Sequence, residues 1–121
     1  MVKLFAFLKR REGMTAEAFH DHWRNSHGPL IAGNEDLARH IVRYEQHARH
    51  QPGILSGTEG YDGVTEQWFA SMDEFVGFMT EPDYASLVHP DEQRFLDMEN
   101  LVFIVTEEPH VVIDGPTGGG A

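Results

Sequence analysis

The spacing of hydrophobic positions changes from strand-like to helix-like along the first third of the chain. Residues 2–9 are apolar at nearly every position, which predicts a strand buried on both faces. The next apolar positions recur at helical spacing and form one stripe: Ala16, Phe19, Trp23 and Leu30. Thr15 offers an N-cap and Gly28-Pro29 a stop signal. The pattern therefore predicts a first helix over residues 16–27.

Later segments repeat this strand and helix pattern. Strands are expected at residues 40–47, 64–70 and 101–105, and residues 110–113 either extend the last strand or pair elsewhere. A second helix is expected to begin after Ser71 and to break at Glu81-Pro82-Asp83. A short helix is expected over Asp91 to Met98. The resulting order, β-α-β-β-α-β, is that of an α+β, ferredoxin-like fold with a four-stranded antiparallel sheet.

The remaining segments are rich in glycine and proline. Residues 51–63 contain Pro52 and four glycines, which predicts a long loop of the kind that serves as a lid or specificity segment. The tail, residues 114–121, cannot bury surface and is expected to be disordered. With 121 residues in total, the chain fits one domain, which we place at residues 1–113.

Charge narrows the range of partners. Acidic residues outnumber basic ones by 20 to 9, and the formal net charge is −11. No Lys/Arg cluster forms a stripe that could follow phosphates, so no nucleic acid is expected as a partner. Neutral or weakly acidic ligands are easier to bind. The apolar N-terminal stretch is too short for a signal or membrane segment, which makes the cytoplasm the default compartment, without membrane contact.

The predicted sheet has more apolar side chains than its helices can cover. Two or three helices on one face would leave part of the following set exposed: Phe5, Phe7, Tyr44, Trp68 and Phe103. An exposed apolar sheet face predicts a partner that packs against it.

The stretch KLFAFLKRREGMTAEAFHDHWRNSHGPL resembles the opening of EthD-like proteins in the dimeric α+β barrel superfamily. A strand ending in a basic pair, a Gly-Met-Thr cap and a Phe-x-x-x-Trp-x-x-x-His-Gly-Pro helix recur there. The later stretch YDGVTEQWFASMDEF resembles the third strand and second helix of the same family. The resemblance implies a homodimeric α+β barrel, in which two sheets face each other and cover the exposed face.

The superfamily implied by this resemblance hosts several activities, including lactone isomerases, aromatic cyclases, decarboxylases, and haem-degrading or cofactor-free monooxygenases. Function must therefore come from the site residues. The chain has no cysteine, and the sequence contains no Ser-His-Asp order, phosphate loop or dinucleotide fingerprint.

Three histidines lie in the first predicted helix. On a regular helix His20 and His27 share one side, whereas His22 points away and is expected at the surface. Helical metal pairs require a spacing of four residues, so no metal is expected. His27 would sit in the last helical turn, where the negative helix end favours the imidazolium form.

His27 has two readings. It can act as a general acid–base beside the barrel mouth, or it can hydrogen-bond a helix carbonyl and help the chain turn. Because of the family resemblance, we weigh a catalytic or ligand-binding role of His27 equally with the purely structural role.

On the second strand, Tyr44 is expected to bind a ligand oxygen and His47 to act as a second acid or base. The two differ in strand parity, so a regular strand would point them to opposite faces, and Tyr44 is the stronger candidate.

Aromatic residues complete the expected substrate-binding set. Trp68 or Phe69 would stack on a planar substrate, although core packing is an alternative for each. Phe5, Phe7 and Trp23 are further candidates for the wall of the cavity.

Tyr61 and Asp62 lie at the entrance of the third strand, where a carboxylate can act as a base. Asp62-Gly63 can also be a simple turn, which is the reading we favour.

The leading hypothesis is a cofactor-independent homodimeric enzyme that isomerises, cyclises, decarboxylates or dehydrates an aromatic, lactone or polyketide-like small molecule. An oxidoreductase, either a cofactor-free monooxygenase or one that uses haem, is the first alternative. A non-catalytic small-molecule carrier is the second.

Overall fold

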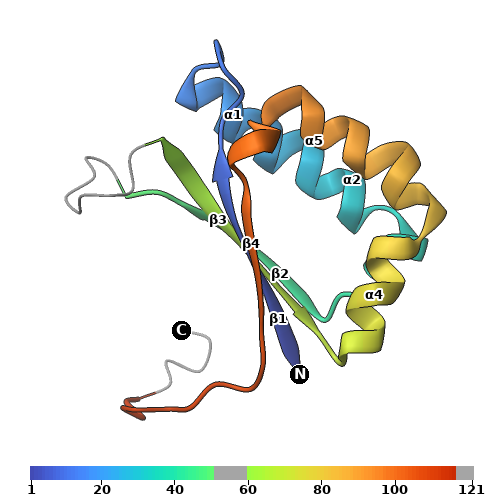
Figure 1. Cartoon of the computed structure of the whole chain (residues 1–121), viewed down its shortest axis with the longest axis vertical. Helices are drawn as coiled ribbons and strands as arrows, with labels where there is room; N and C mark the ends of the chain where they lie inside the picture. The colour runs from blue at the N-terminus through green and yellow to red at the C-terminus, as the bar shows by residue number, and fades with distance from the viewer. Residues whose placement is uncertain (51–59, 117–121) are drawn as a thin grey trace.

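A computed structural model of the chain describes residues 1–50 and 60–116 (Figure 1). Its elements are β1 (Val2–Lys9), α1 (Ala16–His22), η1 (Trp23–His27), α2 (Gly28–Ala32), α3 (Glu35–Ala38), β2 (Arg43–Ala48), β3 (Tyr61–Phe69), α4 (Met72–Thr80), η2 (Tyr84–Val88), α5 (His89–Phe95), η3 (Met98–Asn100) and β4 (Val102–Thr106). The elements η1 and η2 are π-helical turns, and η3 is a 3-10 turn.

The four strands form one antiparallel sheet in the order β2-β3-β1-β4. The helices lie together on one face of this sheet (Figure 1). The architecture confirms the predicted ferredoxin-like α+β fold. The strand bounds agree for β1 and shift by one to three residues elsewhere.

Alternation along the strands sends every second side chain toward the helices. On β1 the buried residues Leu4, Ala6 and Leu8 face the helices. The core against them contains the largest fully buried side chains: Trp23, Phe19, Phe69, Phe95, Leu37 and Val88. Most of these come from the helices, so the core lies between the sheet and the helical layer.

The first helical segment does not end where the sequence predicts. Thr15 caps α1 as expected, accepting a hydrogen bond from the Ala18 N–H at 3.1 Å. The chain then passes through η1, where the Gly28 N–H donates to the Trp23 carbonyl five residues earlier, and continues as α2. Pro29 occupies the first turn of α2, where it needs no N–H partner. The predicted stop at Gly28-Pro29 is therefore wrong.

The second helical segment has the same construction. The π-helical turn η2 runs into α5, whose first turn contains Pro90. The predicted helix over residues 91–98 is wrong at both ends, because α5 begins at His89 and Leu96 is already extended, with φ −109° and ψ 147°. The two halves of the fold thus share a π turn followed by a proline-capped α-helix.

Several other boundaries differ from the predictions. The predicted loop over residues 51–63 ends earlier, because Tyr61, Asp62 and Gly63 belong to β3, and residues 51–59 lie outside the described part of the chain. The favoured reading of Asp62-Gly63 as a turn is therefore wrong. Residues 110–113 form no strand and are exposed. Of the predicted disordered tail, residues 117–121 are also outside the description.

The sheet face away from the helices is called the outer face below. It carries these residues: Lys3, Phe5, Phe7, Arg43, Glu45, His47, Val64, Glu66, Trp68, Val102 and Ile104. Ile104 is 48% exposed and Val102 is 41% exposed, so an apolar part of this face is uncovered in the single chain. Five apolar residues were predicted to be more than the helices can cover. Two of them, Tyr44 and Phe103, line a cavity on the helix side of the sheet.

Among the described residues, no helix has the length and apolar character needed to cross a membrane.

Gly63 is a position where only glycine fits. A Cβ atom there would lie 2.6 Å from Cζ3 and 2.7 Å from Cη2 of the fully buried Trp23 ring. Gly63→Ala is therefore expected to lower the free energy of unfolding by about 1–3 kcal/mol, because the packed indole must shift. Urea unfolding measures the change. Gly115→Ala is the control, since nothing lies within 4 Å of its Cβ position; equal effects of the two variants would contradict the packing argument.

Candidate active site

A small cavity lies between the sheet and the helices. Apolar side chains of β1, β4 and the helical segments form most of its wall, including Leu4, Trp23 and Phe95. Polar side chains interrupt this wall at six positions: His27, Tyr44, Thr65, Gln67, Tyr84 and Glu92. A mostly apolar concave wall with a few converging polar groups is typical of a small-molecule site. The cavity volume is about 40 Å³, the room of roughly one water molecule, so a larger ligand requires the surrounding side chains to move apart.

The most distinctive residue of the cavity wall is His27, which is hydrogen-bonded to Asp91, a residue outside the cavity lining. His27 is 6% exposed and Asp91 is 5% exposed. The Nδ1–H of His27 donates to Oδ2 of Asp91 at 2.8 Å. Since the carboxylate fixes the proton on Nδ1, Nε2 of His27 is the nitrogen left to take a proton from another molecule.

Two more side chains hold the same carboxylate. Nε2–H of His22 donates to Oδ1 and Oδ2 of Asp91 at 3.0 and 3.1 Å, and Nη1 of Arg94 donates to Oδ1 at 3.2 Å. Asp91 therefore accepts from three residues on two helical segments. The prediction that His22 is only a surface residue is wrong.

The π-helical turn η1 explains why His22 and His27 meet. Five residues on a regular α-helix turn through about 500°, which would point the two rings away from each other. The wider i→i+5 turn brings residues five apart back toward the same side. Single π turns of this kind are frequent at functional sites.

Charge states follow from burial and these bonds. Burial lowers the pKa of His27 below 6.5, and this effect exceeds the raising influence of the Asp91 bond and charge. Burial alone would raise the pKa of Asp91, but hydrogen bonds from His27, His22 and Arg94 outweigh it and keep that pKa below its usual value. The lowered pKa of His27 and the lowered pKa of Asp91 both favour a neutral imidazole beside an ionised carboxylate at neutral pH. The predicted helix-end stabilisation of the imidazolium is wrong, because the helical segment continues past His27.

Tyr44 enters the cavity from β2. Its hydroxyl oxygen accepts a hydrogen bond from Nε2 of Gln46 at 3.1 Å, and the same amide nitrogen donates to the Trp23 carbonyl at 2.9 Å. Burial raises the pKa of Tyr44, so its hydroxyl stays protonated and can donate to a ligand oxygen.

A second hydrogen-bonded pair, Tyr84 with Glu92, also lines the cavity. The Tyr84 hydroxyl donates to Oε2 of Glu92 at 3.0 Å. Burial raises the pKa of Glu92, and the bond from Tyr84 only partly opposes this. Burial and the neighbouring Glu92 charge raise the pKa of Tyr84 far above its usual value. Glu92 can therefore carry a proton at a higher pH than an ordinary glutamate.

Gln67 adds an unsatisfied acceptor to the same wall. Its side chain is 4% exposed, and Oε1 has no hydrogen-bond partner among the described residues. A buried acceptor without a partner is costly, and a polar group of a bound molecule would relieve that cost.

The other sequence candidates divide between the two faces of the sheet. Trp23 is fully buried and lines the cavity, whereas Phe69 is fully buried in the core beside it. His47 lies on the outer face, opposite in strand parity to Tyr44, so it does not meet His27 within one chain. The remaining aromatic candidates on the outer face are Phe5, Phe7 and Trp68.

Tyr61 and Asp62 lie away from the cavity lining. The Lys9 ammonium is 4.6 Å from the centre of the Tyr61 ring. Asp62 is 6% exposed and accepts from the backbone N–H and from Nη1 of Arg10, both at 3.0 Å. These bonds give Asp62 a structural role at the end of β1.

Sequence reasoning missed Asp91, Glu92 and Tyr84. Asp91 and Glu92 follow Pro90 at a predicted helix start, where acidic residues commonly interact with the helix dipole. Because that role explains them, the sequence gives no sign that they belong to a site. A spacing search could not pair Asp91 with His27 either, because 64 positions separate them.

The fold places the chain among small α+β proteins with a four-stranded antiparallel sheet. Residues 11–99, more than half of the chain, match the EthD domain. The chain therefore belongs to the EthD domain family, which confirms the resemblance seen in the sequence.

Two similar proteins are named as dehydratases. The conidial pigment biosynthesis dehydratase EthD of Metarhizium robertsii is 27% identical over 99 residues, covering 73% of this chain and 68% of that protein. The dehydratase ustZ of Ustilaginoidea virens is 24% identical over 115 residues, covering 88% of this chain and 82% of that protein. The family thus includes dehydratase-type enzymes.

Solved structures support the fold. A dimeric protein of unknown function and ferredoxin-like fold from Bacteroides fragilis matches with a TM-score of 0.66 and 17% identity, covering 88% of this chain and 95% of that one. At this identity the likeness concerns the fold alone.

The charge state of His27 can be measured without a substrate. We expect its imidazole to titrate below pH 6.5, because burial disfavours the cation. Since the unfolded imidazole binds its proton at higher pH, this group makes stability fall as pH drops from 6.5 through the lower folded pKa. NMR titration of the ring proton, assigned with His27→Gln, tests both the value and its direction.

Asp91→Asn is the companion variant. It should lower the pKa of His27 further, because it removes the carboxylate charge that raises it. A pKa above 6.5 in the natural chain, or a rise in Asp91→Asn, would show that the electrostatic description is wrong.

Proposed function

We propose that this chain is a cofactor-independent dehydratase that removes water from a neutral or weakly acidic aromatic, lactone or polyketide-like small molecule. The observation that carries the proposal is the buried His27, which lines a mostly apolar cavity and is hydrogen-bonded to the buried Asp91. The dehydratase names of two relatives favour water loss over the isomerase, cyclase and decarboxylase alternatives.

His27 would act as the general base. Its Nε2 would take a proton from a carbon next to a carbonyl group of the substrate, and the released electron pair would form the new double bond as the neighbouring C–OH bond breaks. Asp91 would keep Nδ1 protonated and stabilise the imidazolium that forms. His22 and Arg94 would hold Asp91 in place as positioning residues.

The leaving hydroxyl needs a proton to depart as water. Glu92 is suited to supply it, because burial raises its pKa and Tyr84 holds one of its oxygens. Tyr44 would donate a hydrogen bond to the carbonyl oxygen, where negative charge develops. Proton transfer within a dry cavity meets the needs of this reaction, so we propose no cofactor.

We further propose that the chain works as a homodimer through its outer face. The exposed side chains Val102 and Ile104 lie there, and the similar Bacteroides fragilis protein is described as dimeric. A second copy would bury this apolar surface and close a barrel of two sheets.

Activity should depend on the His–Asp pair. A panel of cyclic β-hydroxy ketones that become aromatic on losing water can be screened by mass spectrometry for loss of water. With any turned-over compound, His27→Ala should lower kcat/KM by about 100-fold or more, because the base is removed. Asp91→Asn should lower it by about 10–100-fold, because the tautomer is no longer fixed.

The control for these variants is His110→Gln, which changes an exposed histidine outside the cavity. It should retain full turnover. Unchanged turnover in His27→Ala would refute the acid–base role, and tight binding without conversion would favour the carrier alternative.

The oligomeric state gives a separate test. Light scattering should report twice the 13.7 kDa mass of one chain. Ile104→Glu should shift the protein toward monomer, because a charge would be buried against the second sheet. Val76→Glu, at a 49% exposed position of α4 on the helix side, is the matched control and should remain dimeric. A monomeric natural chain would exclude the barrel.

A further inference from the structure

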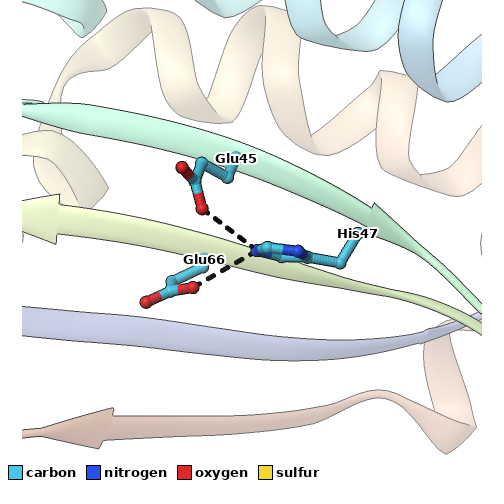
Figure 2. A group of neighbouring side chains, drawn as sticks. All are labelled: Glu45, His47 and Glu66. Atoms are coloured by element: carbon cyan, nitrogen blue, oxygen red, sulfur yellow. Dashed lines mark hydrogen bonds and ion pairs between the residues drawn. The ribbon is translucent and has the colours of Figure 1, made fainter. Parts of the chain in front are cut away.

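Three potential metal ligands converge on the outer face of the sheet. Glu45 and His47 come from β2 and Glu66 from β3, and their side chains point toward one another above the strands (Figure 2). One donor atom from each residue lies within 4.8 Å of the other two. The sheet itself separates the group from the His27 cavity, so the group does not depend on the proposed dehydratase site. It lies on the outer face that the proposed second copy would cover.

The strand register places two carboxylates directly opposite each other on the outer face, and each of them has one basic partner, Arg43 for Glu45 and Lys3 for Glu66. Glu45 and Glu66 are direct cross-strand partners, and like charges directly opposite each other are destabilising. His47 follows two positions after Glu45 on the same face and directs its ring nitrogen between them (Figure 2).

A single proton does not fit this arrangement well. Nε2 of His47 lies 3.3 Å from Oε1 of Glu45 and 3.2 Å from Oε1 of Glu66. The contact with Glu66 is a hydrogen bond, and both distances are longer than the roughly 2.7–2.9 Å of charge-assisted hydrogen bonds. A small cation between the three atoms would satisfy all of them.

Two of the three ligand separations fit such a cation closely, and the third lies within 4.8 Å. Zinc binds imidazole nitrogen and carboxylate oxygen at about 2.0–2.2 Å, so two ligands of one ion at tetrahedral or octahedral angles lie about 3.0–3.4 Å apart. The separations of 3.2 and 3.3 Å around His47 fall within this range.

The outer oxygens of both carboxylates are held by basic side chains. Nε of Arg43 donates to Oε2 of Glu45 at 2.7 Å, and Nζ of Lys3 is 3.3 Å from Oε2 of Glu66. These contacts orient the carboxylates so that Oε1 of each faces His47, as supporting bonds do in metal sites. The positive charges of Arg43 and Lys3 also repel any further cation. Only an ion that bonds strongly to imidazole overcomes this repulsion, so the site favours such ions over Mg²⁺ and Ca²⁺.

We propose that Glu45, His47 and Glu66 form a binding site for a divalent transition metal of the zinc type. Three protein ligands leave a fourth position for water or for a group of another molecule. From the sequence we expected no metal, because the histidine pairs we considered were spaced along one helix. This site uses one strand and its neighbour instead.

Zinc binding to the full chain tests the proposal. Isothermal titration with ZnCl₂ should show one site per chain, and its affinity should fall at least tenfold in His47→Gln and in Glu66→Gln. Zinc should raise the Tm of the natural chain and lose this effect in both variants, because a ligand of the folded state shifts unfolding by mass action. Titration with Co²⁺ should give visible absorption bands of a nitrogen–oxygen site that are absent in His47→Gln.

His110→Gln and His27→Gln are the controls, since each removes a histidine outside the group, and both should bind zinc as the natural chain does. Circular dichroism confirms that the variants are folded. No zinc binding at millimolar concentration, or unchanged affinity in His47→Gln, would overturn the proposal and leave a histidine–glutamate ion pair. Loss of binding in His27→Gln with retention in His47→Gln would move the metal to the other face.

Discussion

The carboxylate of Asp91 is the group on which the arrangement of the helical layer and the cavity depends. It accepts from His22 and His27 on the first helical segment and from Arg94 on its own. Removing one partner of a buried charged network commonly costs about 3–5 kcal/mol, since the remaining charge stays buried without compensation. The same bonds fix the tautomer of His27. Stability and the chemistry of the cavity therefore rest on one side chain.

The π-helical turns are the backbone feature that makes this network possible. Each precedes a proline in the first turn of the next helix, at Pro29 and at Pro90. A proline inside an uninterrupted α-helix would clash and leave a carbonyl without its partner. The wider turn avoids this conflict, keeps the helical direction and rotates the following residues. Gln46 gives the Trp23 carbonyl of the first turn an additional donor from the sheet.

The fold was largely predictable, and the site only in part. Apolar alternation placed β1, and the caps at Thr15 and Ser71 marked the correct helix starts. His27 and Tyr44 were identified and do line one cavity. The end of the first helix was misplaced because glycine and proline usually terminate helices, and nothing in local propensity distinguishes a π turn from a stop. Asp91 and Glu92 were missed because their role comes from tertiary contacts rather than from spacing.

The alternation of β3 carries a consequence for its pairing. Gln67 faces the cavity, and its neighbour Glu66 faces outward toward His47. A slip of one residue would move Glu66 into the place of Gln67, putting a charged carboxylate in the apolar cavity, and would move Gln67 into the place of Trp68 between Lys3 and Arg43 on the outer face. It would also put Trp68 where Phe69 packs. Both faces thus penalise the same error, so this strand is protected against misregistered pairing during folding, when a β-sheet is most exposed to association with other chains.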